Sequence, residues 1–141
     1  MVSASSRKLI VFSLFGVGCS LNPSYDEVID KSVNDIAVKT ETVLAKADSK
    51  QLSTKEQNEY FAASLGTVRA MKARASLIPK NEIEVEMLGS LETRLKNLAD
   101  RKKPLRRSIA TALRLSILDL QKVQSAKKRS QKVSDSIGNS E

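Results

Sequence analysis

The chain has 141 residues, of which 40% are hydrophobic and 28% are charged, and its formal net charge is +8. This length accommodates one domain, and a content of 5 Gly and 3 Pro excludes collagen-like and Pro/Gly-rich disordered classes. The sequence contains no His, no Trp and a single cysteine, Cys19. A His-based triad, a His-ligated metal site and an intrachain disulfide are therefore impossible.

Residues 1–18 have the layout of a cleaved targeting segment. Two cations, Arg7 and Lys8, precede an uncharged apolar run over residues 9–17, and small residues follow. These are the parts of a secretory signal peptide. The run is shorter than the about 20 apolar residues that a membrane-spanning helix needs, and no basic cluster follows it. We therefore predict a signal peptide over residues 1–18.

The only cysteine follows this segment directly, in the pentapeptide FGVGC at residues 15–19. The pentapeptide resembles the lipobox of bacterial lipoproteins, although Gly16 stands where Leu is commonest in that family. The resemblance implies cleavage between Gly18 and Cys19, a diacylglycerol on the Cys19 thiol, and acylation of the new N-terminus. Residues 19–23 would then be a stable tether, because two or more acyl chains anchor a protein firmly. The alternatives are an ordinary buried cysteine, a signal peptide without lipidation, or a segment that stays attached.

The residue after the cysteine bears on localisation. In enteric lipoproteins an Asp at this position retains the protein in the inner membrane, whereas this chain has Ser20. The resemblance thus implies a protein of the bacterial cell envelope, attached to a membrane through the lipid on Cys19. It points to the outer membrane, facing the periplasm, more than to the inner membrane. The remainder of the chain is similar in style to small helical lipoproteins of Gram-negative bacteria.

Four helix starts are expected in this remainder. Residues 24–27 and 53–56 have the form of capping boxes, in which Ser24 and Ser53 stand three positions ahead of Glu. An analogue led by Asn81 occurs at residues 81–84. The fourth start is marked by Pro104, because a proline costs no hydrogen bond at the first helical position.

Hydrophobic periodicity agrees with these starts, and no segment shows the sustained alternation of a strand. Short connections place successive helices antiparallel. We expect an all-α, antiparallel up-down bundle of three to four helices over residues 24–130, in which the last two helices are alternatively one kinked rod. Residues 131–141 are predicted to form a disordered tail. The four apolar stripes comprise residues 29, 33, 36, 40, 43 and 47; 61, 65, 68, 71, 75 and 78; 88, 91, 95 and 98; and 109, 113, 116, 120 and 123.

Charge is unevenly distributed along the chain. Residues 20–60 contain 5 basic and 8 acidic side chains, a net of −3, whereas residues 94–132 contain 13 basic and 2 acidic side chains, a net of +11. This asymmetry suggests either a polyanionic partner or packing of the basic helix beside the acidic first helix, and the second interpretation is slightly favoured. The candidate anion-binding residues are Lys102, Lys103, Arg106, Arg107, Arg114, Lys127, Lys128 and Arg129.

The sequence offers little that indicates catalysis. It contains no Gly-rich phosphate loop and no nucleophile elbow, and the pair formed by Glu82 and Glu86 suits a helix N-terminus better than a metal. We expect no enzyme activity, cofactor or metal. The predicted function is that of a structural or interaction module of the envelope, with an envelope protein or a second copy as partner. The alternative is a polyanion-binding protein for anionic lipid, lipopolysaccharide or nucleic acid. Nucleic acid is disfavoured because residues 94–132 contain no aromatic side chain for base stacking.

Overall fold

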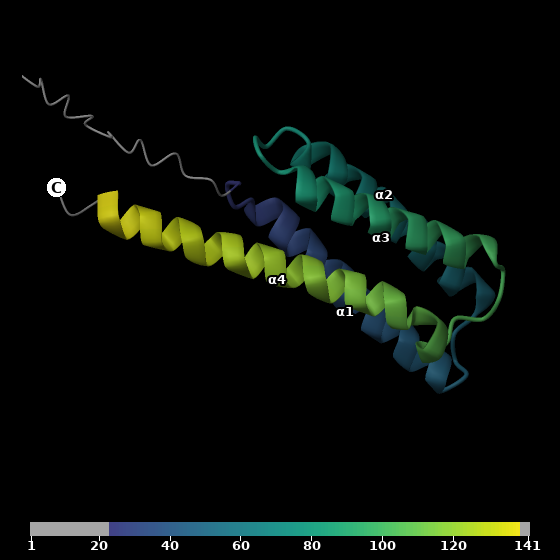
Figure 1. The fold of residues 1–141 in the computed structure, drawn as a ribbon. Coiled ribbons are helices and arrows are strands. Elements are labelled where there is room, and N and C mark those ends of the chain that lie inside the picture. Colours follow the sequence, from purple (N-terminus) through teal and green to yellow (C-terminus); the bar gives the residue numbers. More distant parts are fainter. Residues whose placement is uncertain (1–22, 139–141) are drawn as a thin grey trace, which may run out of the picture.

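A computed structural model describes residues 23–138 of the chain. This part forms four helices in an antiparallel up-down bundle, which confirms the predicted all-α architecture (Figure 1). α1 packs against α2 and α4, and α3 packs against the same two helices. The predicted signal peptide and most of the predicted tether lie outside the described residues. The helices are α1 (Glu27–Asp48), α2 (Thr54–Ala75), α3 (Glu82–Asp100) and α4 (Arg107–Gly138).

The core consists of aliphatic side chains from all four helices, with Tyr60 and Phe61 as its aromatic members. Most stripe positions that the sequence predicts are buried, but the inward face of α1 passes through Leu44, while Val43 is only partly buried. The inward face of α4 is likewise displaced by one residue, because positions 110, 117 and 124 are buried while the predicted positions 109, 116 and 123 are partly buried. Polar side chains are buried as well, and Thr40 is one of them. Thr40 and Tyr60 share a hydrogen bond of 2.7 Å between their hydroxyl oxygens, and burial raises the pKa of Tyr60. This bond joins α1 to α2 within the apolar interior.

The two predicted capping boxes have different outcomes. The box led by Ser53 is confirmed, because the Ser53 side chain accepts from the Glu56 amide and the Glu56 side chain accepts from the Ser53 amide. The box led by Ser24 is wrong. The N-cap of α1 is Asp26, whose carboxylate accepts hydrogen bonds from the Val28 and Ile29 amides. With the N-cap at Asp26 the helix begins two residues later than the Ser24 box predicts, and the carboxylate interacts favourably with the helix dipole.

The starts of α3 and α4 also depart from expectation. Asn81 is the N-cap position of α3, but its side chain makes no capping hydrogen bond; it is buried and donates to the Ala75 carbonyl oxygen at 3.2 Å. Pro104 is not the first residue of α4, which begins three residues later at Arg107. A non-helical connection over residues 101–106 separates α3 from α4, so the single kinked rod is excluded.

α4 is the longest helix and extends beyond its neighbours. It has 32 residues, against 22 in α1 and α2 and 19 in α3, and its last turns project past the start of α1 (Figure 1). Residues 131–138, which we expected to belong to a disordered tail, are therefore helical. Residues 139–141 lie outside the described part. No helix between residues 23 and 138 combines the length and the hydropathy needed to cross a bilayer.

The loops between helices use lysine where glycine is usual. Lys50, Lys80 and Lys102 have φ angles of 58°, 60° and 50°. After α1, the Lys50 amide donates to the Ala47 carbonyl and the Gln51 amide donates to the Lys46 carbonyl. This is a complete Schellman motif, in which the residue with positive φ is normally glycine. The chain thus accepts backbone strain at a helix end and gains an exposed cation there.

Candidate functional site

The predicted basic residues are divided by the fold into three groups. Arg107, Arg114 and Lys128 form ion pairs with α1, and Lys127 is buried between α3 and α4. The rest are exposed and make no ion pair with any residue in the described part of the chain; they are Lys102, Lys103, Arg106 and Arg129. The eight residues therefore do not form one anion-binding site.

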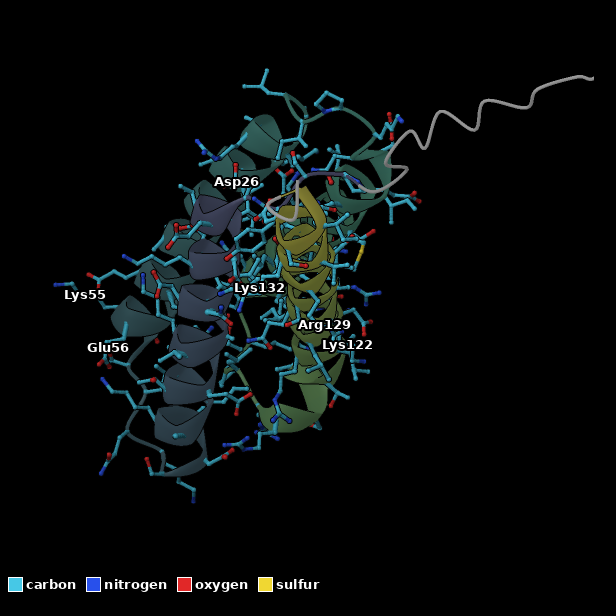
Figure 2. All side chains as sticks on the ribbon, turned by 90° about the vertical axis from the view of Figure 1, so that its left-hand side faces the viewer. Asp26, Lys55, Glu56, Lys122, Arg129 and Lys132 are labelled. Carbon is cyan, nitrogen blue, oxygen red and sulfur yellow. The ribbon has the colours of Figure 1, made fainter. Side chains whose placement is uncertain are left out.

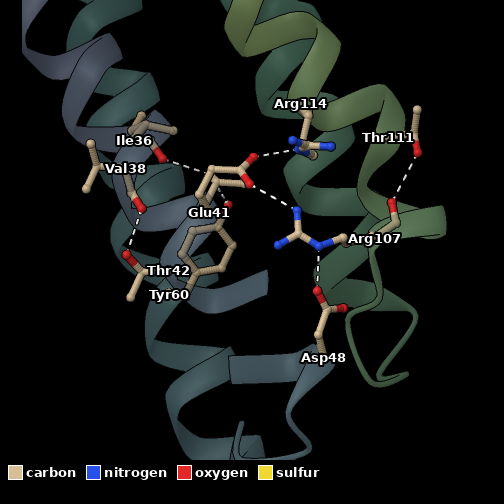
Figure 3. Close-up of polar contacts among 10 residues, drawn as sticks. Ile36, Val38, Glu41, Thr42, Asp48, Tyr60, Arg107, Thr111 and Arg114 are labelled. Carbon is tan, nitrogen blue, oxygen red and sulfur yellow. Dashed lines mark hydrogen bonds and ion pairs between the residues drawn. The ribbon is translucent and has the colours of Figure 1, made fainter. Parts of the chain in front are cut away.

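The first group forms a ladder along the α1–α4 contact. Glu41 accepts from Arg114 Nε at 2.5 Å and from Arg107 Nη1 at 3.2 Å, and Arg107 Nε also donates to Asp48 at 2.5 Å (Figure 3). Hydrogen bonding to Arg114, followed by that to Arg107, holds the pKa of Glu41 below its usual value, and the hydrogen bond to Asp48 raises the pKa of Arg107.

The ladder continues towards the start of α1. One helical heptad beyond Arg114, Gln121 Nε2 donates to Asn34 Oδ1 at 2.8 Å, and a further heptad on, Lys128 Nζ lies 3.8 Å from an Asp30 carboxylate oxygen. Seven-residue spacing keeps these positions on one flank of α4. The predicted packing of the basic helix beside the acidic first helix is confirmed, and it accounts for part of the charge asymmetry.

The second group is a buried polar cluster that sequence reasoning missed. Lys127 Nζ donates to Glu84 Oε2 and, at 2.5 Å, to Asn81 Oδ1, while Gln124 Nε2 donates to Glu84 Oε1. The side chains of Glu84 and Lys127 are 1% and 7% exposed. The spacing of these residues could have indicated their burial. Glu84 precedes the buried Leu88 by one turn, and Gln124 and Lys127 follow the buried Leu120 at steps of four and three residues.

Arg129 of the third group lies near the C-terminal end of α4, whereas the loop residues of this group, Lys102, Lys103 and Arg106, leave unpaired charge at the other end of the molecule. We call this end, which contains the loops at residues 49–53 and 101–106, the distal pole. Its connection to α4 is held by Gln57, whose buried amide donates to the Lys103 carbonyl at 3.0 Å and accepts from the Leu105 amide at 2.8 Å. Lys102, Lys103 and Arg106 thus project from a loop that is fixed at two backbone positions.

The opposite end contains the start of α1, the loop at residues 76–81 and the end of α4; we call it the N-terminal pole. Arg74 Nε of α2 donates to Asp26 at 2.6 Å. Partial burial alone would raise the pKa of Asp26, but the hydrogen bonds from Arg74 and from the Ile29 amide outweigh it and hold this pKa below its usual value. The Tyr25 hydroxyl donates to Asp30 at 2.7 Å, which raises the pKa of Tyr25 to about 12. Lys128 lies 5.5 Å above the same ring.

Exposed apolar side chains gather at the N-terminal pole. Within the described range, five of the eight exposed large apolar residues are found there: Val28, Leu77, Ile83, Val133 and Ile137. Beside them, a cleft of about 370 Å³ between α3 and α4 is lined by Pro23, Ile83 and Val123 among others. The other three are Val38 on α1 and Leu115 and Leu118 on α4.

Comparison with known proteins adds no assignment. No family model matches the chain, and neither a curated protein nor a solved structure matches it. Residues 23–138 hold no group of three or more His, Cys, Asp or Glu side chains with metal-binding geometry. The features of the chain that indicate a function are therefore the sequence of residues 1–19 and the two unlike poles of the bundle.

Proposed function

We propose that the protein is a lipid-anchored helical lipoprotein of the bacterial cell envelope, which acts by contact and not by catalysis. The observation that carries the proposal is the position of the only cysteine, directly after a basic and then apolar segment that ends in small residues. Acyl chains on Cys19 would anchor the protein, and the helical bundle would begin a few residues later. The partner would be an envelope protein or a second copy, and the location the periplasmic face of the outer membrane.

The fold supports this proposal through its elongated helices and its two unlike ends. The side of the bundle where α1 meets α4 is neutralised by ion pairs, whereas the poles carry exposed apolar or unpaired basic side chains. A rod of this kind can hold one end at a membrane and present the other about 30 Å away, which is the length of a 22-residue helix.

Intact mass of the protein from the membrane fraction of a bacterial host tests lipidation. We expect a mass that lacks residues 1–18 and includes a diacylglycerol and one further acyl chain. Cys19→Ser should give the uncut, unacylated chain. Cys19→Ser combined with Ser24→Cys is the matched control, because it keeps one thiol but places it outside the motif, and it should also remain unacylated. An unacylated, uncut wild-type chain would reject the proposal.

A second candidate function, binding of an anionic envelope component, is favoured by the unpaired cations of the distal pole. Phosphate-bearing headgroups attract Lys and Arg by about 1 kcal/mol per residue near an anionic surface. Replacing Lys102, Lys103 and Arg106 by Gln should abolish salt-sensitive binding to purified lipopolysaccharide. Arg107→Gln is the control, since Arg107 is already paired with Asp48 and Glu41. Equal binding of lipopolysaccharide by the two variants would exclude the distal pole as the binding site.

A further inference from the structure

We infer that the N-terminal pole is a docking surface for the phospholipid bilayer that holds the acyl chains of Cys19. This inference rests on the proposed function. It adds that the N-terminal pole of the bundle contacts the membrane directly, so that the tether is not the only attachment. The occupant is the interfacial layer of the bilayer, and the contact is mainly apolar.

The first argument is the length of the linking chain. Cys19 precedes Pro23 by four residues, and four residues span at most about 14 Å. Pro23 lines two clefts of the N-terminal pole, one beside Ile83 and Val123 and one that runs along α4 as far as Ser134. A glycerol-linked lipid on Cys19 therefore keeps this pole within reach of the headgroup layer, which is roughly 5–8 Å thick on each side of the hydrocarbon.

The second argument is the projection of α4. The ladder pairs Lys128 with Asp30, so in an antiparallel arrangement residues 132–138 extend past the start of α1 by about 10 Å. Val133 and Ile137 are on this projection and are 57% and 68% exposed. The projection thus extends far enough to enter the interfacial layer when Cys19 is inserted.

The third argument is that the apolar side chains of this pole form a line. Val123, Ala126, Val133 and Ile137 follow three- and four-residue steps along α4 through Ser130, so they occupy one flank of the helix. Val123 and Ala126 share a cleft with Ile83 of α3, and Leu77 of the adjoining loop is 84% exposed. Interfacial helices bind membranes with an apolar flank of this kind.

Basic residues border the line and suit a surface that contains anionic lipid. Figure 2, which looks onto this pole, shows Arg129 and Lys132 near the end of α4 and Asp26 at the start of α1. Arg129 lies one turn from both Ala126 and Val133, where its long side chain can extend to a phosphate while the apolar residues enter the interface. Asp135 and Glu82 are also exposed here, and they partly offset the attraction of the cations to anionic lipid. The contact therefore depends mainly on the apolar side chains.

Lipid-quenching of a reporter on the lipidated full chain tests the inference. Acylation leaves the wild-type chain without a free thiol, so a fluorophore can be attached at Ser134→Cys or, on the distal pole, at Lys102→Cys. In vesicles of phosphatidylethanolamine and phosphatidylglycerol with brominated acyl chains, we expect severalfold stronger quenching at residue 134 than at residue 102. High salt should change the quenching little, because the contact is mainly apolar.

A substitution separates docking from simple tethering. Val133→Ser with Ile137→Ser should reduce quenching at residue 134 severalfold. Leu115→Ser with Leu118→Ser removes exposed apolar residues from the side of α4 and should leave quenching unchanged. If the Val133/Ile137 variant is quenched like the parent, or if high salt abolishes the quenching, the docking surface is refuted. Mass spectrometry of the same preparation reports lipidation of Cys19 separately, so a failure of the proposed function is recognised independently.

Discussion

The buried pair of Glu84 and Lys127 should dominate the response of the bundle to mutation. Replacing Lys127 by Met leaves the Glu84 carboxylate with the Gln124 amide as its remaining hydrogen-bond donor, in a site where Glu84 is 1% exposed. Breaking a buried pair on one side costs about 3–5 kcal/mol, because an uncompensated charge remains in a medium of low polarity. Against a total stability of about 5–15 kcal/mol for a domain, this loss is severe.

Removing the ion pair together with Gln124 should cost less than breaking the pair on one side. In the triple variant Glu84→Leu, Gln124→Leu and Lys127→Met, no charge and no buried glutamine amide remains between α3 and α4. Replacing buried ion pairs by apolar residues of similar volume is often neutral or stabilising, and Gln124 Oε1 already has no hydrogen-bond partner in the described structure. Asn81 Oδ1 loses its Lys127 donor in the single and in the triple variant, at a cost of about 1–3 kcal/mol. We therefore expect the triple variant to be less stable than the parent by no more than this amount, and clearly more stable than Lys127→Met.

Urea denaturation followed by far-ultraviolet circular dichroism measures both effects as free energies of unfolding. All of the substitutions are made in one cluster of one chain, so the differences between the variants report the cluster itself. Glu84→Gln provides the complementary single change, which leaves the Lys127 ammonium buried and should also be strongly destabilising. The reasoning is refuted if Lys127→Met costs less than about 1 kcal/mol, or if the triple variant is less stable than that single variant.

Three further changes test the helix ends and the ladder. Lys50→Gly should raise the free energy of unfolding by about 0.5–1 kcal/mol in urea denaturation, since glycine adopts the positive φ of the Schellman motif without strain; a lower stability would contradict the strain argument. Hydrogen bonding to Lys46, and then to Ser53, lowers the pKa of Glu56 from 4.5 to about 2. Its stabilising contribution should be complete above pH 4.5 and disappear as the pH falls through 2, so urea titrations of Glu56→Gln and the parent should differ at pH 7 and converge near pH 2. Glu41→Gln should lower stability by about 0.5–1 kcal/mol at low salt and by less in 1 M NaCl, because both of its arginine contacts are solvent-exposed; a loss independent of salt would contradict the ladder's electrostatic role.

The fold was predictable from the sequence because apolar spacing, caps and short connections all favour the same architecture. The start of α2 is the clearest case, since the Ser53–Glu56 box is local and both partners lie within one turn. The start of α1 is harder to place because Ser24 and Asp26 both have capping side chains. Asp26, the residue that caps the helix, also pairs with Arg74, which is distant in sequence. Local patterns do not contain that contact.

The candidate site was less predictable for the same reason. Among eight basic residues of one region, the sequence does not distinguish Lys127, which is buried, from Arg129, which is exposed, until the register of α4 against α3 is known. The cationic run KKRSQK at residues 127–132 also suggests that α4 frays there. The opposite holds, because Glu84 and Asn81 supply partners that allow the helix to stay packed through this turn.

The positions of the charges support a polar molecule with two distinct ends. The ion pairs of the ladder neutralise Arg107, Arg114 and Lys128 along the α1–α4 contact, and Lys127 is neutralised inside the bundle. Unpaired cations consequently remain where no acidic helix lies alongside, chiefly on the fixed loop that Gln57 holds at the distal pole. Exposed apolar side chains are instead most frequent at the N-terminal pole, where α4 extends beyond α1 and no helix covers Val133 and Ile137. Charge pairing and unequal helix length, both written in the sequence, thus produce the two unlike poles on which the membrane-docking proposal depends.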